Sequence, residues 1–109
     1  MERRRYERVN FFCRVGLTTL PGAPVREGRS TDISLGGVGL TTGGQFAVGQ
    51  PVTVTFYLRD PRQGEVQDQV PGRVVNLKAD MDGNRLGVEF LEPLDERRHP
   101  LLVRKVLSL

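Results

Sequence analysis

The sequence predicts an all-β domain, a six-stranded antiparallel barrel of Greek-key type with a C-terminal α-helix. Short runs rich in Val, Phe, Leu and Thr alternate between apolar and polar residues with period two, which is typical of strands with one buried face. The 13 glycines and 7 prolines are scattered between these runs, where they predict turns. Near the C-terminus the alternation ends and apolar residues recur at helical spacing. Six short antiparallel strands most simply close into a barrel, because closure removes exposed sheet edges.

Six runs carry the strand pattern, and we expect the barrel to extend over residues 9–92. The runs cover residues 9–17, 26–34, 38–42, 48–60, 70–79 and 84–92. In the first run the apolar face carries Val9, Phe11, Cys13, Val15 and Leu17. The alternation is clearest in the fourth run, where one face carries Val52, Val54, Phe56 and Leu58. Residues 21–24 predict a turn and residues 60–65 a loop, while Asp82 and Gly83 predict a tight hairpin between the last two strands.

The segment over residues 94–109 predicts a helix. Asp95 is a candidate N-cap and Pro100 belongs in a first turn, so the regular helix is expected to begin at residue 99 or 100. Arg104 and Lys105 suit the negative end of the helix dipole. One apolar stripe carries Leu102, Val106 and Leu109, with Val103 and Leu107 beside it.

The composition is that of one globular domain spanning residues 1–109. Hydrophobic residues make up 38% and charged residues 27%, close to the usual values for such a domain. The sequence has neither an apolar run long enough to cross a bilayer nor the apolar core of a secretory signal, which predicts a cytoplasmic protein without membrane insertion. A single cysteine, Cys13, excludes an internal disulfide and suits a reducing compartment. It lies on an apolar strand face, so we interpret it as a core residue.

The N-terminal stretch RRRYER is unusually basic for a chain whose net charge is +3. Arg4 and Arg8 form an R-x-x-x-R pair preceded by Arg3. At this spacing two guanidinium groups share one face of an extended segment, and also of a helix. Planar guanidinium forks suit phosphate and the O6/N7 edge of guanine, because each makes two parallel hydrogen bonds. The alternative interpretation is a solvated basic tail.

The stretch DISLGG, residues 32–37, carries a second polar pattern. Asp32 and Ser34 share one face of an extended run. A carboxylate accepts hydrogen bonds from the N1–H and N2–H groups of guanine, and a hydroxyl donates or accepts one. Gly36 and Gly37 allow a sharp turn and the close approach of a flat ligand. The alternative interpretation is an Asx-type turn that leads into a hairpin.

Together the two patterns resemble the signature of the PilZ domain family. The motif RR-x-x-x-R is followed, 24 residues after Arg8, by D-x-S-x-x-G. The resemblance extends from Arg3 to the C-terminal helix, because GGVGL, VGQPVTVTFYL, GRVVN and RLGVEFLEP are similar to strand sequences of the family in the same order. The signature positions are matched by Arg4, Arg8, Asp32, Ser34 and Gly37.

The resemblance implies a non-enzymatic receptor for the bacterial second messenger cyclic di-GMP, with a six-stranded barrel and a trailing helix. It implies that Arg4 and Arg8 contact guanine edges and phosphates, and that Asp32 and Ser34 read a guanine beside the glycines. In the family an arginine at the position of Arg3 is associated with two intercalated ligand molecules, so we expect that mode. We further expect residues 1–8 to be mobile without ligand and to become ordered on binding, which a separate protein partner would detect.

Two alternatives remain open at this stage. One is a PilZ-fold adaptor that acts through protein partners without binding nucleotide. The other is a small basic barrel that binds nucleic acid, for which Tyr6 and Tyr57 are the candidate stacking residues. The second is disfavoured, because most of the aromatic residues alternate into predicted core faces.

The sequence predicts neither a catalytic site nor a cofactor or metal site. DMDGN, residues 80–84, lacks the glycine position and the terminal glutamate of a calcium loop. One histidine, His99, and one cysteine do not make a zinc site. The motifs of serine hydrolases, P-loop NTPases and zinc proteases do not occur.

Overall fold

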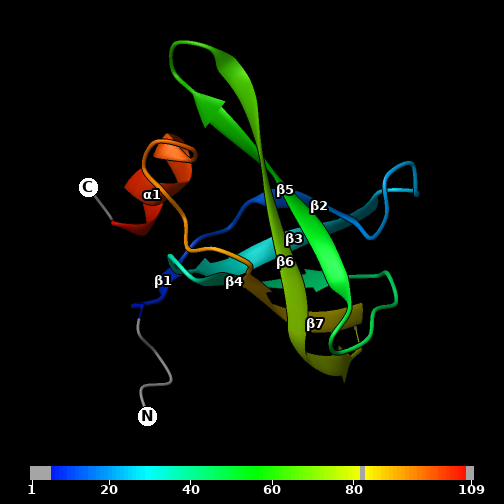
Figure 1. The fold of residues 1–109 in the computed structure, drawn as a ribbon. Coiled ribbons are helices and arrows are strands. Elements are labelled where there is room, and N and C mark those ends of the chain that lie inside the picture. Colours follow the sequence, from blue (N-terminus) through cyan, green and yellow to red (C-terminus); the bar gives the residue numbers. More distant parts are fainter. Residues whose placement is uncertain (1–5, 82, 108–109) are drawn as a thin grey trace.

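The computed structural model describes residues 6–81 and 83–107, with Asp80 described by its backbone only. These residues form seven antiparallel strands and one helix (Figure 1). The elements are β1 (Val9–Asn10), β2 (Arg14–Thr18), β3 (Arg26–Ile33), β4 (Gly37–Thr42), β5 (Pro51–Asp60), β6 (Gly64–Asp80), β7 (Gly83–Phe90) and α1 (Pro100–Val106). Within this described part, the helix is too short to cross a membrane.

The strands form one sheet in the order β1-β3-β2-β5-β6-β7-β4, and β4 pairs back with β3. This last pairing closes β2 to β7 into a barrel, with β1 as an extra strand along β3. The prediction of a six-stranded antiparallel barrel followed by a helix is therefore confirmed. The antiparallel pairing of β1 with β3 places the residues that precede β1 next to the β3–β4 turn, which positions the candidate site.

The first predicted strand, residues 9–17, is divided into β1 and β2. Asn10 lies opposite Asp32, whereas Arg14 lies opposite Arg29, so the first strand has one more residue than β3 between these pairs. The extra residue makes a bulge over residues 11–13. The backbone still bonds to β3 on both sides of it, from Phe11 N to Thr31 O at 3.0 Å and from Ser30 N to Cys13 O at 2.8 Å.

The barrel interior is filled by the predicted apolar faces. Phe56 on β5 is fully buried, and its ring lies 6.5 Å from that of Phe11 and 6.4 Å from that of Phe90. The buried apolar residues of the central strands are Val15, Leu17, Ile33, Val38, Leu40, Val52, Val54, Leu58, Val70, Val74, Leu86 and Val88. Cys13 also belongs to this core, as its place in the alternation predicted.

The β5–β6 hairpin is longer than predicted. Residues 64–69 are strand, although part of this run was expected to be loop. Polar residues with weak strand propensity fill one of its faces, and Pro71 lies within it, so the pattern is hard to detect. Pro71 is tolerated because β6 begins to pair with β7 only at Gly72, and the missing N–H removes no bond to that strand. Figure 1 shows the hairpin projecting beyond the rest of the sheet, beside α1.

Helix α1 begins later than Asp95, which is not its N-cap. His99 occupies the N-cap position and Pro100 begins the first turn. Asp95 instead accepts a hydrogen bond from Arg97 N at 2.7 Å, in a turn that precedes the helix. This bond stabilises the carboxylate and lowers the pKa of Asp95. The buried face of α1 carries Leu102, Val103 and Val106, as the stripe predicted, whereas Leu107 is exposed.

Candidate functional site

Arg8 and Asp32 meet on the outer surface of the barrel. Asp32 lies near the end of β3, and Arg8 immediately precedes β1, which pairs with that part of β3. Arg8 Nε lies 3.4 Å from Asp32 Oδ2. The side chains are 39% and 34% exposed, so both remain accessible to a ligand. An ion pair this exposed contributes only about 0–1 kcal/mol to stability, and a ligand can replace it at little cost.

Glycines make the surface around this pair flat. A Cβ atom on Gly39, which lies opposite Asp32 on β4, would overlap the Asp32 carboxylate. A Cβ atom on Gly36 would lie 2.7 Å from a ring carbon of Tyr6, so the ring rests directly on the Gly36 backbone. Tyr6 and Arg8 therefore hold the segment before β1 against the β3–β4 turn at two points.

Ser34, Gly36 and Gly37 build that turn. Ser34 N donates to Gly37 O at 2.9 Å, and Ser34 Oγ accepts from Gly36 N at 3.1 Å. Ser34 is buried, so its hydroxyl shapes the turn in this structure. Gly37 faces β7, where an added Cβ would lie 2.6 Å from Val88 O. Close strand packing thus requires a glycine at position 37.

The turn is also bonded to the segment that leads into α1. Phe90 N donates to Gly36 O at 2.9 Å, and Leu94 N donates to Leu35 O at 2.7 Å. Leu94 is itself buried in the core. A displacement of the turn would therefore also displace the segment between β7 and α1, because these hydrogen bonds link the two.

The seven predicted site residues fall into three groups. Arg3 and Arg4 lie outside the described residues, as do most of residues 1–8, which were expected to be mobile. Arg8 and Asp32 are brought together, and the described backbone places the remaining members in the adjacent turn: Ser34, Gly36 and Gly37. The sequence interpretation missed Gly39 and the position of Tyr6, because both depend on strand register and tertiary contact.

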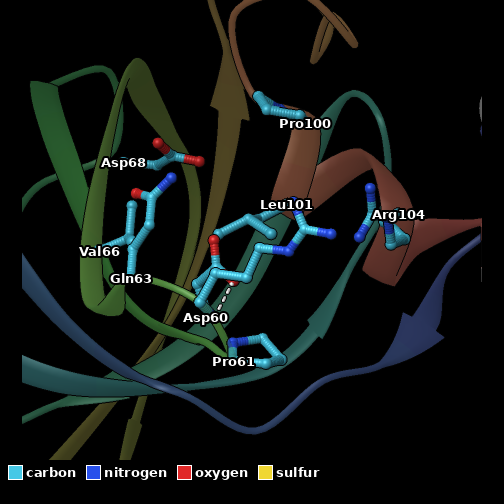
Figure 2. Close-up of a pocket in the computed structure, with 9 residues that line it drawn as sticks. Asp60, Pro61, Gln63, Val66, Asp68, Pro100, Leu101 and Arg104 are labelled. Atoms are coloured by element: carbon cyan, nitrogen blue, oxygen red, sulfur yellow. Dashed lines mark hydrogen bonds between the residues drawn. The ribbon is translucent and has the colours of Figure 1, made fainter.

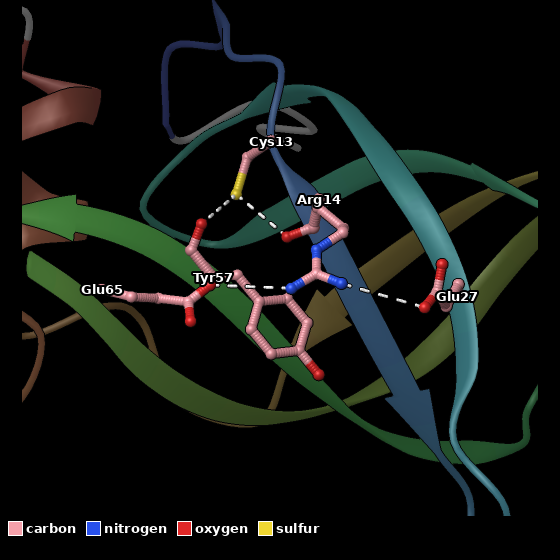
Figure 3. A network of polar contacts seen from close by, with 5 residues as sticks. All are labelled: Cys13, Arg14, Glu27, Tyr57 and Glu65. Atoms are coloured by element: carbon pink, nitrogen blue, oxygen red, sulfur yellow. Dashed lines mark hydrogen bonds and ion pairs between the residues drawn. The ribbon is translucent and has the colours of Figure 1, made fainter.

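A separate polar network covers the outer face of β2 (Figure 3). Arg14 lies 3.9 Å from Glu27 and 3.6 Å from Glu65, and its guanidinium carbon is 4.3 Å from the centre of the Tyr57 ring. The Cys13 Sγ lies 3.1 Å from Arg14 O and 3.4 Å from Tyr57 O, and its single proton can be donated to either carbonyl. Burial raises the pKa of Cys13, which keeps the thiol protonated and unreactive at neutral pH. Arg14 covers one face of the Tyr57 ring, so that face is not available for base stacking.

A pocket of about 520 Å³ lies between the β5–β6 hairpin and α1 (Figure 2). Its lining includes Asp60, Val66 and Asp68 from the hairpin and Leu101 and Arg104 from the helix. Asp68 Oδ2 is buried without a hydrogen-bond partner in the described structure. Within residues 6–81 and 83–107, His, Cys, Asp and Glu side chains do not gather into a set that could hold a metal ion.

Replacing Asp68 by asparagine is expected to raise Tm slightly at pH 7. Burial raises the pKa of Asp68, and the nearby His99 offsets this in part. The ionised carboxylate therefore costs stability above its folded-state pKa, and protonation removes this cost as pH falls through that value. The advantage of Asp68→Asn should vanish below about pH 3.9, the ordinary aspartate pKa. Thermal unfolding at both pH values tests this, with the exposed Glu96→Gln as control; an advantage that persists in acid contradicts it.

A family model described as PilZ domain matches residues 2–108 of the chain. A search of the curated proteins finds no sequence that matches significantly. Among solved structures, the chain is similar to the inhibitor of motility MotI/DgrA of Bacillus subtilis, with 20% identity and a TM-score of 0.73, over 99% of this chain and 53% of that one. The chain thus spans about half the length of that protein.

Two further structures contain cyclic di-GMP. The PilZ domain of YcgR from Escherichia coli is 20% identical, with a TM-score of 0.69 over 99% of this chain and 92% of that one. MrkH of K. pneumonia is 18% identical, with a TM-score of 0.65 over 99% of this chain and 54% of that one. At these identities the structural similarity establishes the fold.

Proposed function

This chain belongs to the PilZ domain family, and we propose that it is a cyclic di-GMP receptor whose bound state is detected by a protein partner. PilZ domains are non-catalytic receptors, which agrees with the prediction that the chain is not an enzyme. The observation that carries the proposal is the Arg8–Asp32 pair, which lies exposed on a surface kept flat by Gly36 and Gly39.

The chemistry of the pair suits this ligand, which has two guanines and two phosphates. The Asp32 carboxylate would accept hydrogen bonds from N1–H and N2–H of a guanine. Arg8 would place its fork on a phosphate or on the O6/N7 edge. Ser34 already accepts a bond from Gly36 N and keeps its hydroxyl proton to donate.

Arg3 and Arg4 complete the proposed site. They lie outside the described residues, and we assign them from the family signature. Arg4 would supply the second guanidinium of the R-x-x-x-R pair. Arg3 favours the mode in which two intercalated ligand molecules bind. Gly37, which the family signature includes, would keep β4 packed against β7, and Gly36 would leave room beside the guanine where Tyr6 now rests.

We propose that the ligand acts by competing with two contacts of the protein. Arg8 now pairs with Asp32, and the Tyr6 ring lies on Gly36. A nucleotide that takes the same groups must rearrange both contacts. The turn is bonded to Leu94 through Leu35, so the change would reach the segment before α1. A partner that contacts this region would distinguish the two states.

Addition of cyclic di-GMP to the ¹⁵N-labelled protein is expected to shift the amide signals of Arg8, Asp32 and Gly36 most. The Leu94 amide should shift as well, because its hydrogen bond ends on the same turn. Gly64, at the far end of the projecting hairpin, serves as the internal control. Shifts confined to the signature residues, with Leu94 unchanged, would disprove the proposed route to the helix.

Isothermal titration of the whole chain with cyclic di-GMP tests the function itself. Saturable binding in the micromolar range or tighter supports the receptor and gives the ratio of ligand to protein. A ratio of two supports the intercalated mode inferred from Arg3. A folded protein that releases no heat and shows no amide shifts would exclude the receptor and leave the adaptor that acts through protein partners.

A further inference from the structure

The β5–β6 hairpin carries an open strand edge. On one side β6 pairs with β5 along residues 64–73, but on the other side it pairs with β7 only from Gly72 onward. Successive residues of an antiparallel strand direct their N–H and C=O groups to opposite edges. Pro71 O accepts a bond from Leu91 N, on the β7 side. Gln69, Gln67 and Glu65 therefore direct their backbone groups to this same side.

These three residues have no strand partner on that side among the described residues. All three are exposed. Among the described strands, β1 and the part of β5 beyond Phe56 also pair on one side only, and the unpaired stretch of β6 is longer than either. An exposed row of unpaired N–H and C=O groups is a template for another strand. The projection of the hairpin in Figure 1 leaves its end clear of the other strands.

We propose that this edge pairs with the same edge of a second copy of the chain, antiparallel and about a two-fold axis at Gln67. In this register Gln67 lies opposite Gln67 of the second copy, and Glu65 lies opposite its Gln69. Each of these residues donates its N–H to the facing strand and accepts at its C=O. The two hairpins then form one continuous four-stranded sheet between the two barrels.

The charges along the edge allow it to pair with itself. Antiparallel pairing about Gln67 places Glu65 against a neutral amide and Val66 against Asp68 of the second copy. Like charges, which destabilise a directly opposed pair, therefore do not face each other. Glu65 is further neutralised by Arg14, whose guanidinium lies 3.6 Å away. A two-fold contact of this kind is closed, so it ends at a dimer.

Sedimentation velocity of the nucleotide-free chain over a concentration series tests the dimer. We expect the average mass to rise from monomer towards dimer with concentration. Two variants that add the same charge should then act in opposite directions. Gln69→Lys faces Glu65 of the second copy and should lower the dimer Kd by about fivefold, because two attractive pairs form. Gln67→Lys faces itself and should raise Kd by about fivefold.

A proline variant distinguishes loss of pairing at the β6 edge from destabilisation of the domain. Gln67→Pro removes an N–H that has no strand partner among residues 6–81 and 83–107, so Tm should change little while the dimer is lost. Gln67→Thr keeps the N–H and should remain dimeric. A chain that stays monomeric at all concentrations, or a dimer insensitive to these substitutions, overturns the proposal. The measurement needs no cyclic di-GMP, so its outcome is independent of the proposed receptor function.

Discussion

Replacing Arg8 or Asp32 by alanine is expected to weaken cyclic di-GMP binding by at least about 30-fold. Truncating an arginine that binds a ligand directly lowers the binding free energy by about 2 kcal/mol or more, which corresponds to a roughly 30-fold loss of affinity. Removing Asp32 leaves the guanine N–H groups without their charged acceptor, which costs a similar amount. Isothermal titration of the two variants beside the wild type measures the loss.

Measurements of stability distinguish a loss of binding from a loss of folding in these variants. The Arg8–Asp32 pair is partly exposed, so either substitution should change the free energy of unfolding by about 1 kcal/mol or less. Arg59→Ala removes the same charge from the exposed β5 surface and should bind as the wild type does. Wild-type affinity in Arg8→Ala would show that the N-terminal arginines are a solvated tail, as the alternative interpretation held.

Replacing Phe56 by alanine is expected to lower the free energy of unfolding by about 3–5 kcal/mol. Its ring is completely buried and lies between those of Phe11 and Phe90, so truncation leaves a cavity lined by both rings. This is a large share of the stability of a domain of this size. Urea unfolding followed by circular dichroism measures it.

Phe12→Ala is the matched control, because its side chain is 74% exposed. It should change stability by less than about 0.5 kcal/mol. Equal losses in the two variants would mean that the assignment of inner and outer faces on β5 and in the bulge over residues 11–13 is wrong. Loss of all structure in Phe56→Ala would still agree with the expectation, and Phe56→Leu then gives a measurable intermediate.

The strand faces were predictable because burial imposes period two directly on the sequence. Val52, Val54 and Phe56 are buried as the alternation indicated. The bulge over residues 11–13 was not predictable, because it depends on a difference in register between two paired strands. The early part of β6 was missed because its outer face carries Glu and Gln, whose local preference does not indicate a strand.

The chemical groups of the candidate site could be chosen from the sequence. Arg8 and Asp32 were chosen because their groups match those of guanine and phosphate, and the structure places them in contact. The involvement of Tyr6 and Gly39 was not predictable, since neither follows from spacing along the chain. Asp95 was a poor guide to the helix start, because the same side chain can stabilise a turn one step earlier.

The order in which the barrel closes has a consequence for synthesis on the ribosome. Strand β4 ends at Thr42, and its second neighbour β7 begins only at Gly83. At roughly 5–20 residues per second, several seconds of translation separate the two. The nascent chain must therefore carry β4 with one edge unpaired during this interval. Slower translation between these strands would lengthen the time in which a chaperone, or another nascent chain, can capture that edge.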